Sequence, residues 1–298
     1  MFKAMFKRHL LVILILSQFF GGRLLLAKSL NEAPPKVLLI SDIDDTIKVS
    51  HVLSYKSWDP SVVLRIINST TPFKGMASLY QTIKNQNYSQ FNMVYLSNAL
   101  SKKFGLTFIE NSHKKLIKNN GFPEGEMLLK DVAFDKEHKI KAIREMVKKY
   151  NPNVVIMIGD NGEQDAVVYN QATAELKAQG IYAVTYIHQL YWSQSVEEKG
   201  QLLKIGQTGY ATPFEIAYDL YLRKLMNQTS LDWMVKNIIP DISQEKSKFF
   251  LIDILTAVTF PSFKNCADFK WIWPIQNSPE ITQFKNHVLD RCSRHDQD

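Results

Sequence analysis

Strand-like and helix-like stretches alternate along the chain between residues 37 and 187, and this alternation most strongly constrains the fold. The strand-like runs are VLLIS (37–41), FNMVYLS (91–97), EMLLK (126–130), NVVIMIG (153–159) and IYAVTYI (181–187). Stretches with helical periodicity lie between them and include GMASLYQTIKN (75–85), HKIKAIREMVKKY (138–150) and EQDAVVYNQATAELKAQG (163–180). This order predicts an α/β fold, a doubly wound parallel sheet with helices on both faces.

The N-terminal residues differ in composition from everything that follows. A basic start without acids, MFKAMFKRH, precedes the eleven-residue apolar run LLVILILSQFF. That pattern is typical of a secretory signal peptide, and we interpret 1–27 as one, with cleavage after Ala27 and a linker over 28–36. An uncleaved membrane anchor is the alternative, although the apolar run is short for a membrane span. The chain is therefore expected to be exported, to the periplasm or out of the cell.

The signal peptide also distorts the net charge. It holds four of the 36 basic residues and no acidic ones, so the remainder carries 32 basic against 29 acidic residues, a net charge of +3. An excess this small, without a basic cluster interleaved with aromatic residues, does not favour nucleic acid as a partner.

The pattern changes near residue 193. We assign 37–192 to the sheet domain and 193–298 to a helical extension, with a loop predicted over 206–213. The expected helices are PFEIAYDLYLRKLM (213–226), SLDWMVKNII (230–239) and SQEKSKFFLIDILTAVTF (243–260). Both cysteines, Cys266 and Cys292, lie in this extension. In an exported chain they could form a disulfide, and two separate thiols are the alternative.

Polar side chains follow several predicted strands at the point where each strand ends. Because parallel strands end at one edge of a sheet, we expect these groups to line a single crevice. They are Asp42 and Asp44 after the first strand, Ser97 and Asn98 after the second, and Asp160 and Asp165 after the fourth, with Lys139 at the start of a nearby helix.

These residue types suit phosphoryl transfer. A carboxylate at Asp42 can attack phosphorus and form an aspartyl-phosphate intermediate. Ser97, Asn98 and Lys139 would bind the phosphoryl group, which needs fixed donors and positive charge. The acids at the same edge are the hard oxygen ligands that Mg²⁺ prefers, and we predict a Mg²⁺ site formed by Asp42, Asp44, Asp160 and Asp165.

Asp44 is the candidate general acid and base. Asp44 comes two residues after Asp42, so in an extended chain the two side chains lie on the same side. Asp44 could therefore protonate the leaving oxygen and then activate the attacking water. Two carboxyl groups so close should favour one neutral form unless the metal offsets their repulsion.

Taken together, DIDDT, the strand-terminal Ser97, Lys139 and GDNGEQD resemble the four motifs of the haloacid dehalogenase superfamily over residues 37–187. More narrowly, SDIDDTI, PFKGMASLYQTI, FPEGEMLLKD, EHK and GDNGEQDAVVY resemble the catalytic domain of the actin-patch-associated phosphatidate phosphatases. This resemblance implies Mg²⁺-dependent removal of phosphate from phosphatidate. By position it implies Asp42 as nucleophile, Asp44 as acid and base, Ser97 and Lys139 at the phosphate, and Asp160 with Asp165 at the metal. The second motif continues as SNALSKKF, where that family usually has Ser-Pro-Trp. This difference would alter the rim of the substrate site.

Neighbouring residues have simpler interpretations. Asp45 is expected to be a turn acid, and Thr46 to steady the same loop by hydrogen bonding. Glu163 could either cap the following helix or belong to the shell of groups around the metal.

Access to the site follows from spacing. Only residues 47–72 are left for a cap between the first two motifs, so we expect a haloacid-dehalogenase-like domain with a minimal cap, open to a bulky phosphomonoester. The leading hypothesis is an exported phosphatase of phosphatidate or a related lipid phosphate that makes transient contact with a membrane surface. One alternative is a broad phosphatase of small soluble phosphomonoesters, and another is a non-catalytic binding protein of the same fold.

Overall fold

A computed structural model of the chain describes residues 33–50, 52–53, 70–100, 107–132, 135–196, 198–243, 265–274 and 278–293. The chain divides into two compact units, Met1–Pro34 and Pro35–Asp298, and all the described helices and strands lie in the second. The expected signal peptide and most of the linker lie outside the described residues.

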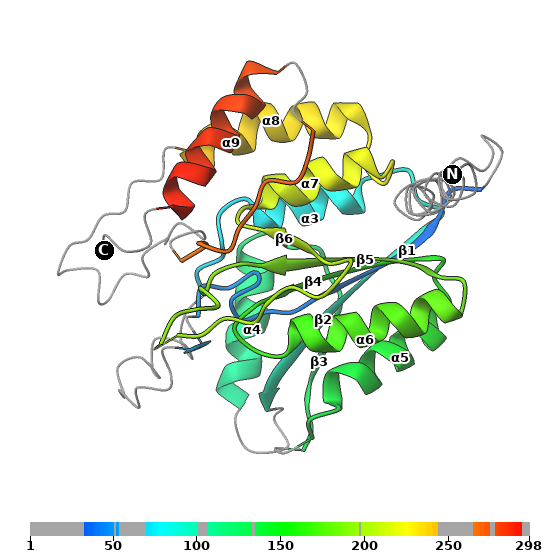
Figure 1. The fold of residues 1–298 in the computed structure, drawn as a ribbon. Coiled ribbons are helices and arrows are strands. Elements are labelled where there is room, and N and C mark those ends of the chain that lie inside the picture. The colour runs from blue at the N-terminus through cyan, green and yellow to red at the C-terminus, as the bar shows by residue number, and fades with distance from the viewer. Residues whose placement is uncertain are drawn as a thin grey trace, which may run out of the picture. The chain divides into compact units, whose positions relative to one another are not determined.

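The described residues form one parallel sheet with the strand order β3-β2-β1-β4-β5-β6 (Figure 1). The strands are β1 Lys36–Ser41, β2 Gln90–Leu100, β3 Glu126–Lys130, β4 Val154–Asp160, β5 Tyr182–His188 and β6 Thr208–Tyr210. The five strands expected from the sequence are all present, and the predicted α/β class is confirmed. The chain crosses from β3 back to β4, so that β1 lies between β2 and β4 at the point where the strand order reverses.

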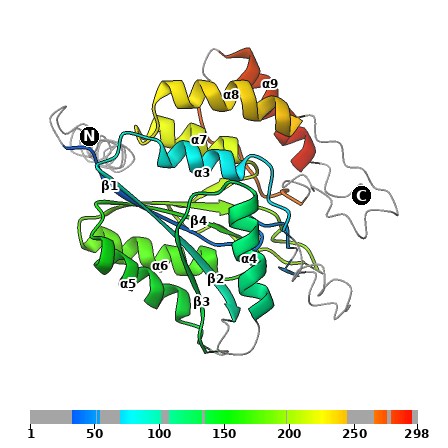
Figure 2. The same ribbon diagram turned by 180° about the vertical axis from the view of Figure 1, so that it is seen from behind.

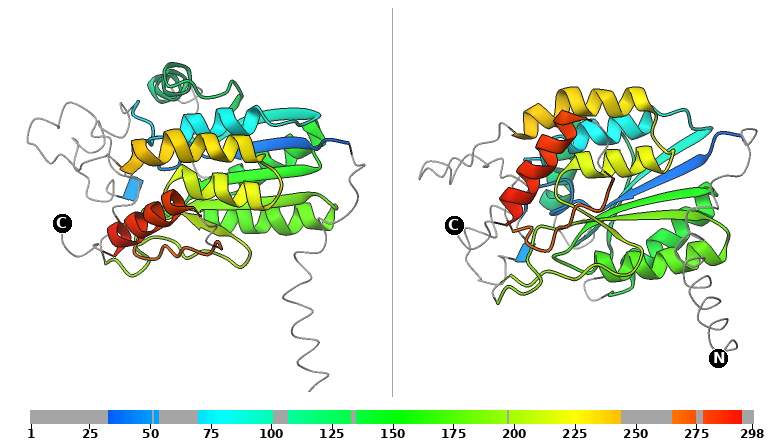
Figure 3. Two further views of the ribbon diagram at one scale, coloured as in Figure 1. Left: turned by 90° about the horizontal axis from the view of Figure 1, so that it is seen from above. Right: turned by 45° about the horizontal axis from the view of Figure 1, so that its top comes forward.

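Helices cover both faces of the sheet (Figures 1 and 2). Those described are α3 Met76–Lys84, α4 Thr107–Asn119, α5 His138–Tyr150, α6 Asp165–Ala178, α7 Pro213–Leu222, α8 Gln228–Ser243 and α9 Pro279–Cys292. Helices α5 and α6 pack on one face, α3 and α7 lie on the other, and α8 and α9 form a further layer over α7 (Figure 3). None of the helices within the described ranges is long and apolar enough to cross a membrane.

The sequence of β1 explains why this strand is central. Val37 and Leu39 point into the core beneath α3 and α7, whereas Leu38 and Ile40 point into the core beneath α5 and α6, and all four are fully buried. Burying one such side chain contributes roughly 1.5–3 kcal/mol relative to leaving it exposed. A strand that is apolar on both faces is typical of a buried parallel sheet, and it holds the residue that follows it in a fixed position.

The C-terminal third differs in part from the expectation. The segment 206–213 was predicted to be a loop, but Thr208–Tyr210 forms β6 and pairs in parallel with the end of β5. Three residues are too few to show a strand periodicity, so the sequence contained no usable signal. The helices expected within 213–226 and 230–239 are present as α7 and α8, while most of the helix predicted over 243–260 lies outside the described residues.

The two cysteines are joined. Cys266 and Cys292 form a disulfide, with their Cα atoms 4.8 Å apart. The bond ties the end of α9 to the segment 265–274. Of the two alternatives left open by the sequence, a disulfide or two separate thiols, the structure has the disulfide.

Candidate active site

Asp42 lies directly beyond β1, at the edge of the sheet where the parallel strands end. Its backbone N–H donates to the carbonyl oxygen of Ile158 on β4 at 2.9 Å, which extends the ladder between the two strands by one residue. Asp42 is only 4 % exposed. The candidate nucleophile therefore has a backbone position set by the sheet rather than by a loop.

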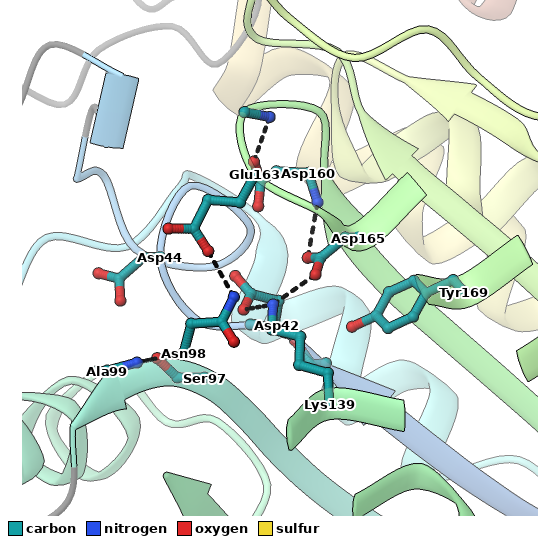
Figure 4. A network of polar contacts seen from close by, with 12 residues as sticks. Asp42, Asp44, Ser97, Asn98, Ala99, Lys139, Asp160, Glu163, Asp165 and Tyr169 are labelled. Atoms are coloured by element: carbon teal, nitrogen blue, oxygen red, sulfur yellow. Dashed lines mark hydrogen bonds and ion pairs between the residues drawn. The ribbon is translucent and has the colours of Figure 1, made fainter. Parts of the chain in front are cut away.

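Lys139, the second residue of α5, reaches this carboxylate from the neighbouring face (Figure 4). Its Nζ donates to Asp42 Oδ1 at 2.6 Å and to Asp165 Oδ1 at 2.5 Å, and the side chain is fully enclosed. One ammonium group thus joins the end of β1 to the first turn of α6, as the predicted convergence requires.

Asp160, the last residue of β4, completes a group of three buried carboxylates. One oxygen from each of Asp42, Asp160 and Asp165 lies within 4.8 Å of the others. The Asp160 carboxylate accepts from the backbone N–H of Gly162 at 2.6 Å. A Cβ at Gly159 would lie 2.4 Å from Asp165 Oδ2, so the strand needs glycine there for α6 to approach so closely.

The charges in this group are unbalanced. Burial raises the pKa of Asp42 well above its ordinary value, Lys139 opposes that effect, and Asp165 adds to it. Burial, followed by the Asp165 and Asp42 carboxylates, likewise raises the pKa of Asp160. For Lys139, burial acts to lower the pKa, but the Asp165 and Asp42 carboxylates outweigh it and raise the pKa well above normal.

These observations fit a divalent cation. Three converging carboxylates with a single ammonium between them leave excess negative charge in a buried place, and that charge favours protonation unless a cation offsets it. The donors are hard oxygens, which Mg²⁺ prefers. Asp42, Asp160 and Asp165 would hold the ion.

Asp44 occupies a different place from the one expected. Its carboxylate is not part of the three-acid group, because the chain turns immediately after it. Asp44 Oδ1 instead accepts from Lys48 Nζ at 3.0 Å and from Ser50 Oγ at 2.6 Å, and Asp44 Oδ2 lies 3.6 Å from His113 Nε2. The Asp44 carboxylate is therefore not among the three converging acids, and its role at the metal stays a prediction.

The surroundings of Asp44 also set its charge. Burial acts to raise its pKa, but Lys48, His113 and the Ser50 hydroxyl outweigh that effect and lower the pKa to about 2. The side chain keeps 20 % of its surface exposed. Of the two neighbouring carboxyl groups, Asp42 is the one whose environment favours the neutral form, and Asp44 is the one held ionised.

Asp45 forms the turn that separates these two environments. It has a left-handed backbone with φ of 59°, and its carboxylate accepts from the backbone N–H groups of Ser50 at 3.0 Å and Val52 at 2.8 Å. The Tyr191 hydroxyl donates to the same carboxylate. The interpretation of Asp45 as a turn acid agrees with these contacts. Thr46 differs from its prediction, because its buried Oγ1 makes no hydrogen bond within the described part of the chain.

Ser97 and Asn98 lie near the end of β2, on the other side of β1 from Asp160. Ser97 is 2 % exposed, and its Oγ accepts from the backbone N–H of Ala99 at 3.0 Å, an arrangement in which the hydroxyl hydrogen can still be donated. Asn98 Nδ2 donates to Glu163 Oε2 at 2.8 Å. Glu163 does not cap α6, whose N-cap residue is Gln164, and its carboxylate is outside the three-acid group.

Sequence reasoning missed the residues that support this edge from within. Lys48 could have been found from the sequence, since it lies four residues after Asp44 in a predicted turn. Nothing in the sequence pointed to His113 or Tyr191, because they reach the site from distant parts of the chain. The same holds for His188, whose Nδ1 lies 2.9 Å from the carbonyl oxygen of Asp45.

Comparison with known proteins agrees with the motifs. Among solved structures, a class C acid phosphatase from Bacillus anthracis with tungstate bound matches with 20 % sequence identity and a TM-score of 0.34, covering 56 % of this chain and 71 % of that one. No curated protein sequence matches. The family model described as phosphatidate phosphatase APP1, catalytic domain, matches residues 37–187, which is half of the chain. On that match, the chain belongs to the family of phosphatidate phosphatase catalytic domains.

Proposed function

We propose that this protein is a Mg²⁺-dependent phosphomonoesterase that forms an aspartyl-phosphate on Asp42. The observation that supports this most directly is the position of Asp42, buried at the end of the central strand, paired with Lys139, and grouped with Asp160 and Asp165. Membership of the phosphatidate phosphatase family supports the same activity.

The first step transfers the phosphoryl group to the protein. The Ser97 hydroxyl, the Asn98 amide and the Lys139 ammonium would bind the phosphoryl oxygens around Asp42. An Asp42 carboxylate oxygen attacks phosphorus, the bond from phosphorus to the ester oxygen breaks, and the leaving alkoxide takes a proton from Asp44. The negative charge of a bound phosphate raises the pKa of Asp44, which lets this carboxyl group carry that proton.

The second step restores the protein. Asp44, now ionised, takes a proton from a water molecule that attacks the aspartyl-phosphate, and inorganic phosphate leaves as Asp42 becomes a carboxylate again. The contacts of Asp44 with Lys48 and Ser50 hold its ionised form, which suits this step. A divalent cation held by Asp42, Asp160 and Asp165 would supply the positive charge that keeps Asp42 ionised and offsets the charge of the phosphate.

The proposed substrate is phosphatidate or a related lipid phosphate, with transient contact at a membrane surface. The name of the matching family supports the lipid. A substrate panel decides between this and a broad phosphatase of soluble esters. We expect faster phosphate release, by kcat/KM, from micellar phosphatidate than from nucleotides and sugar phosphates. A preference for the soluble esters would contradict the lipid assignment.

Asp42→Asn tests the mechanism. We expect phosphate release to fall by about a thousandfold or more, because an amide cannot act as the nucleophile. We expect the wild-type activity to be lost in EDTA and restored by added Mg²⁺. Asp232→Asn is the matched control, since Asp232 on α8 is an exposed acid whose carboxylate accepts from Gln228. Equal activity of Asp42→Asn and wild type would refute the assignment of the nucleophile.

We also propose that the protein is exported, to the periplasm or out of the cell. The N-terminal pattern supports this, and so does the Cys266–Cys292 disulfide, because such bonds persist in oxidising compartments. The N-terminal residue of the protein recovered from fractionated cells tests the proposal.

A further inference from the structure

One polar bridge crosses the site from side to side. Asn98 comes from the end of β2 and Glu163 from the loop after β4, and Asn98 Nδ2 donates to Glu163 Oε2 at 2.8 Å. Since β1 lies between β2 and β4, a contact between these two residues spans the end of β1. Figure 4 shows the pair in front of the Asp42 carboxylate and the Lys139 ammonium.

The contact with Glu163 uses a hydrogen-bond donor of Asn98 that a bound phosphate would need. Asn98 offers a side-chain N–H, follows the buried Ser97 in the chain, and lies near the Asp42 carboxylate and the Lys139 ammonium (Figure 4). In this structure that N–H is given to a carboxylate, which is an anion like the phosphoryl group. Glu163 is also close enough to Lys139 to contribute to raising its pKa. Asn98 Nδ2 carries two N–H groups, and the bond to Glu163 takes one of them and fixes the direction of the amide. Glu163 and a bound phosphate would therefore compete for the orientation of this amide and repel each other.

We propose that Glu163 is a gate residue: its carboxylate holds the Asn98 amide across the end of β1 and releases it to the phosphoryl group of the substrate. The proposal rests on the proposed function, since it concerns the phosphate subsite of that reaction. Glu163 is exposed and makes this contact with a single hydrogen bond, so the exchange requires no rearrangement of the sheet. Glu163 would lower the affinity for phosphate and thereby favour release of the product.

Calorimetric titration of inorganic phosphate into the full chain, with and without Mg²⁺, tests the gate independently of turnover. We expect Glu163→Ala to bind phosphate about three- to tenfold more tightly than wild type, because both the competing acceptor and its charge are gone. Glu163→Gln keeps an acceptor for Asn98 but not the charge, so its dissociation constant should lie between the two. Asn98→Ala should bind phosphate more weakly than Glu163→Ala, because it lacks the donor itself.

Asp232→Asn is the control, since it removes the charge from another exposed amide–carboxylate pair and should leave phosphate binding unchanged. A dissociation constant for Glu163→Ala that is unchanged within twofold, or weaker than wild type, overturns the gate. Weaker phosphate binding together with a raised Mg²⁺ requirement would place Glu163 at the cation instead. If the gate variants behave as expected but wild type hydrolyses nothing in the substrate panel, the catalytic proposal fails while the phosphate gate stands.

Discussion

At the scale of single residues, the sequence predicted which residues form the candidate site better than it predicted the contacts that each of them makes. Asp42, Lys139, Asp160 and Asp165 meet as expected, because each ends or directly follows a strand or lies in the first turn of a helix at one edge of a parallel sheet. Asp44 does not follow this rule. The chain leaves the extended conformation at the next residue, so a prediction based on strand alternation fails there. Its contact with His113 could not be foreseen, because it depends on how α4 packs.

Asp44→Asn tests the electrostatic role of this position. The pKa of Asp44 is lowered from 3.8 to about 2, so its ionised form contributes stability above pH 4 and loses that contribution as the pH falls toward 2. We expect the variant to be less stable than wild type by about 2 kcal/mol at pH 7. The difference should shrink at pH 3. Urea unfolding at both pH values, without metal, measures it, and an equal difference at both would show that the ion pair with Lys48 contributes no charge-dependent stability.

At the scale of elements, strands and helices with a clear period were predicted well, and short or capped elements were not. The sequence did not predict β6, because three residues are too few to show the alternation of a strand. The strand nevertheless extends the sheet beyond β5. Helix α7 begins with a capping box in which Glu215 accepts from the backbone N–H of Thr212 at 2.7 Å and from its hydroxyl at 2.6 Å. The sequence predicted this helix, but not that the acid at its start would be completely buried.

Glu215→Gln tests the cost of that burial. Burial raises the pKa of Glu215 from 4.5 to about 7, against the opposing hydrogen bonds from Thr212. Its contribution to stability is therefore complete below pH 4.5 and is lost as the pH rises through 7. We expect the stability of Glu215→Gln relative to wild type to increase by about 2 kcal/mol between pH 5 and pH 8.5. Chemical unfolding at the two pH values checks this. Thr212→Ala removes a hydrogen bond that favours the ionised form of Glu215, so its stability relative to wild type should change in the opposite direction and fall as the pH rises.

At the scale of the whole molecule, the strand order could not be derived from the sequence, although the class of fold could. Alternating periods predict a parallel sheet, but the placement of β1 between β2 and β4 depends on how the crossover helices pack. The expectation of a helical extension beyond residue 192 also missed that β6 continues the sheet. The disulfide was undecided because pairing depends on the distance between the cysteines, and that distance depends on how both α9 and the segment 265–274 pack on the rest of the fold.

The proposed export makes a prediction about the protein recovered from cells. Protein recovered outside the cytoplasm should begin at or near Lys28, and it should show no free thiol until a reductant is added, because both cysteines are paired. N-terminal sequencing and thiol titration under denaturing conditions measure the two properties. Recovery from the cytoplasm of a chain that begins at Met1 and has two free thiols would contradict the proposal.

The central position of β1 has a consequence for the timing of activity. Asp42, the proposed nucleophile, lies early in the chain, but its partners come from strands and helices that follow much later, on both sides of it. A chain that is threaded unfolded through a bilayer therefore carries no assembled pocket while it passes the lipids. In the proposed exported phosphatase, hydrolysis would begin only after the later segments have crossed and folded around the first strand, so the fold would delay the proposed action on lipids of the membrane that the chain crosses.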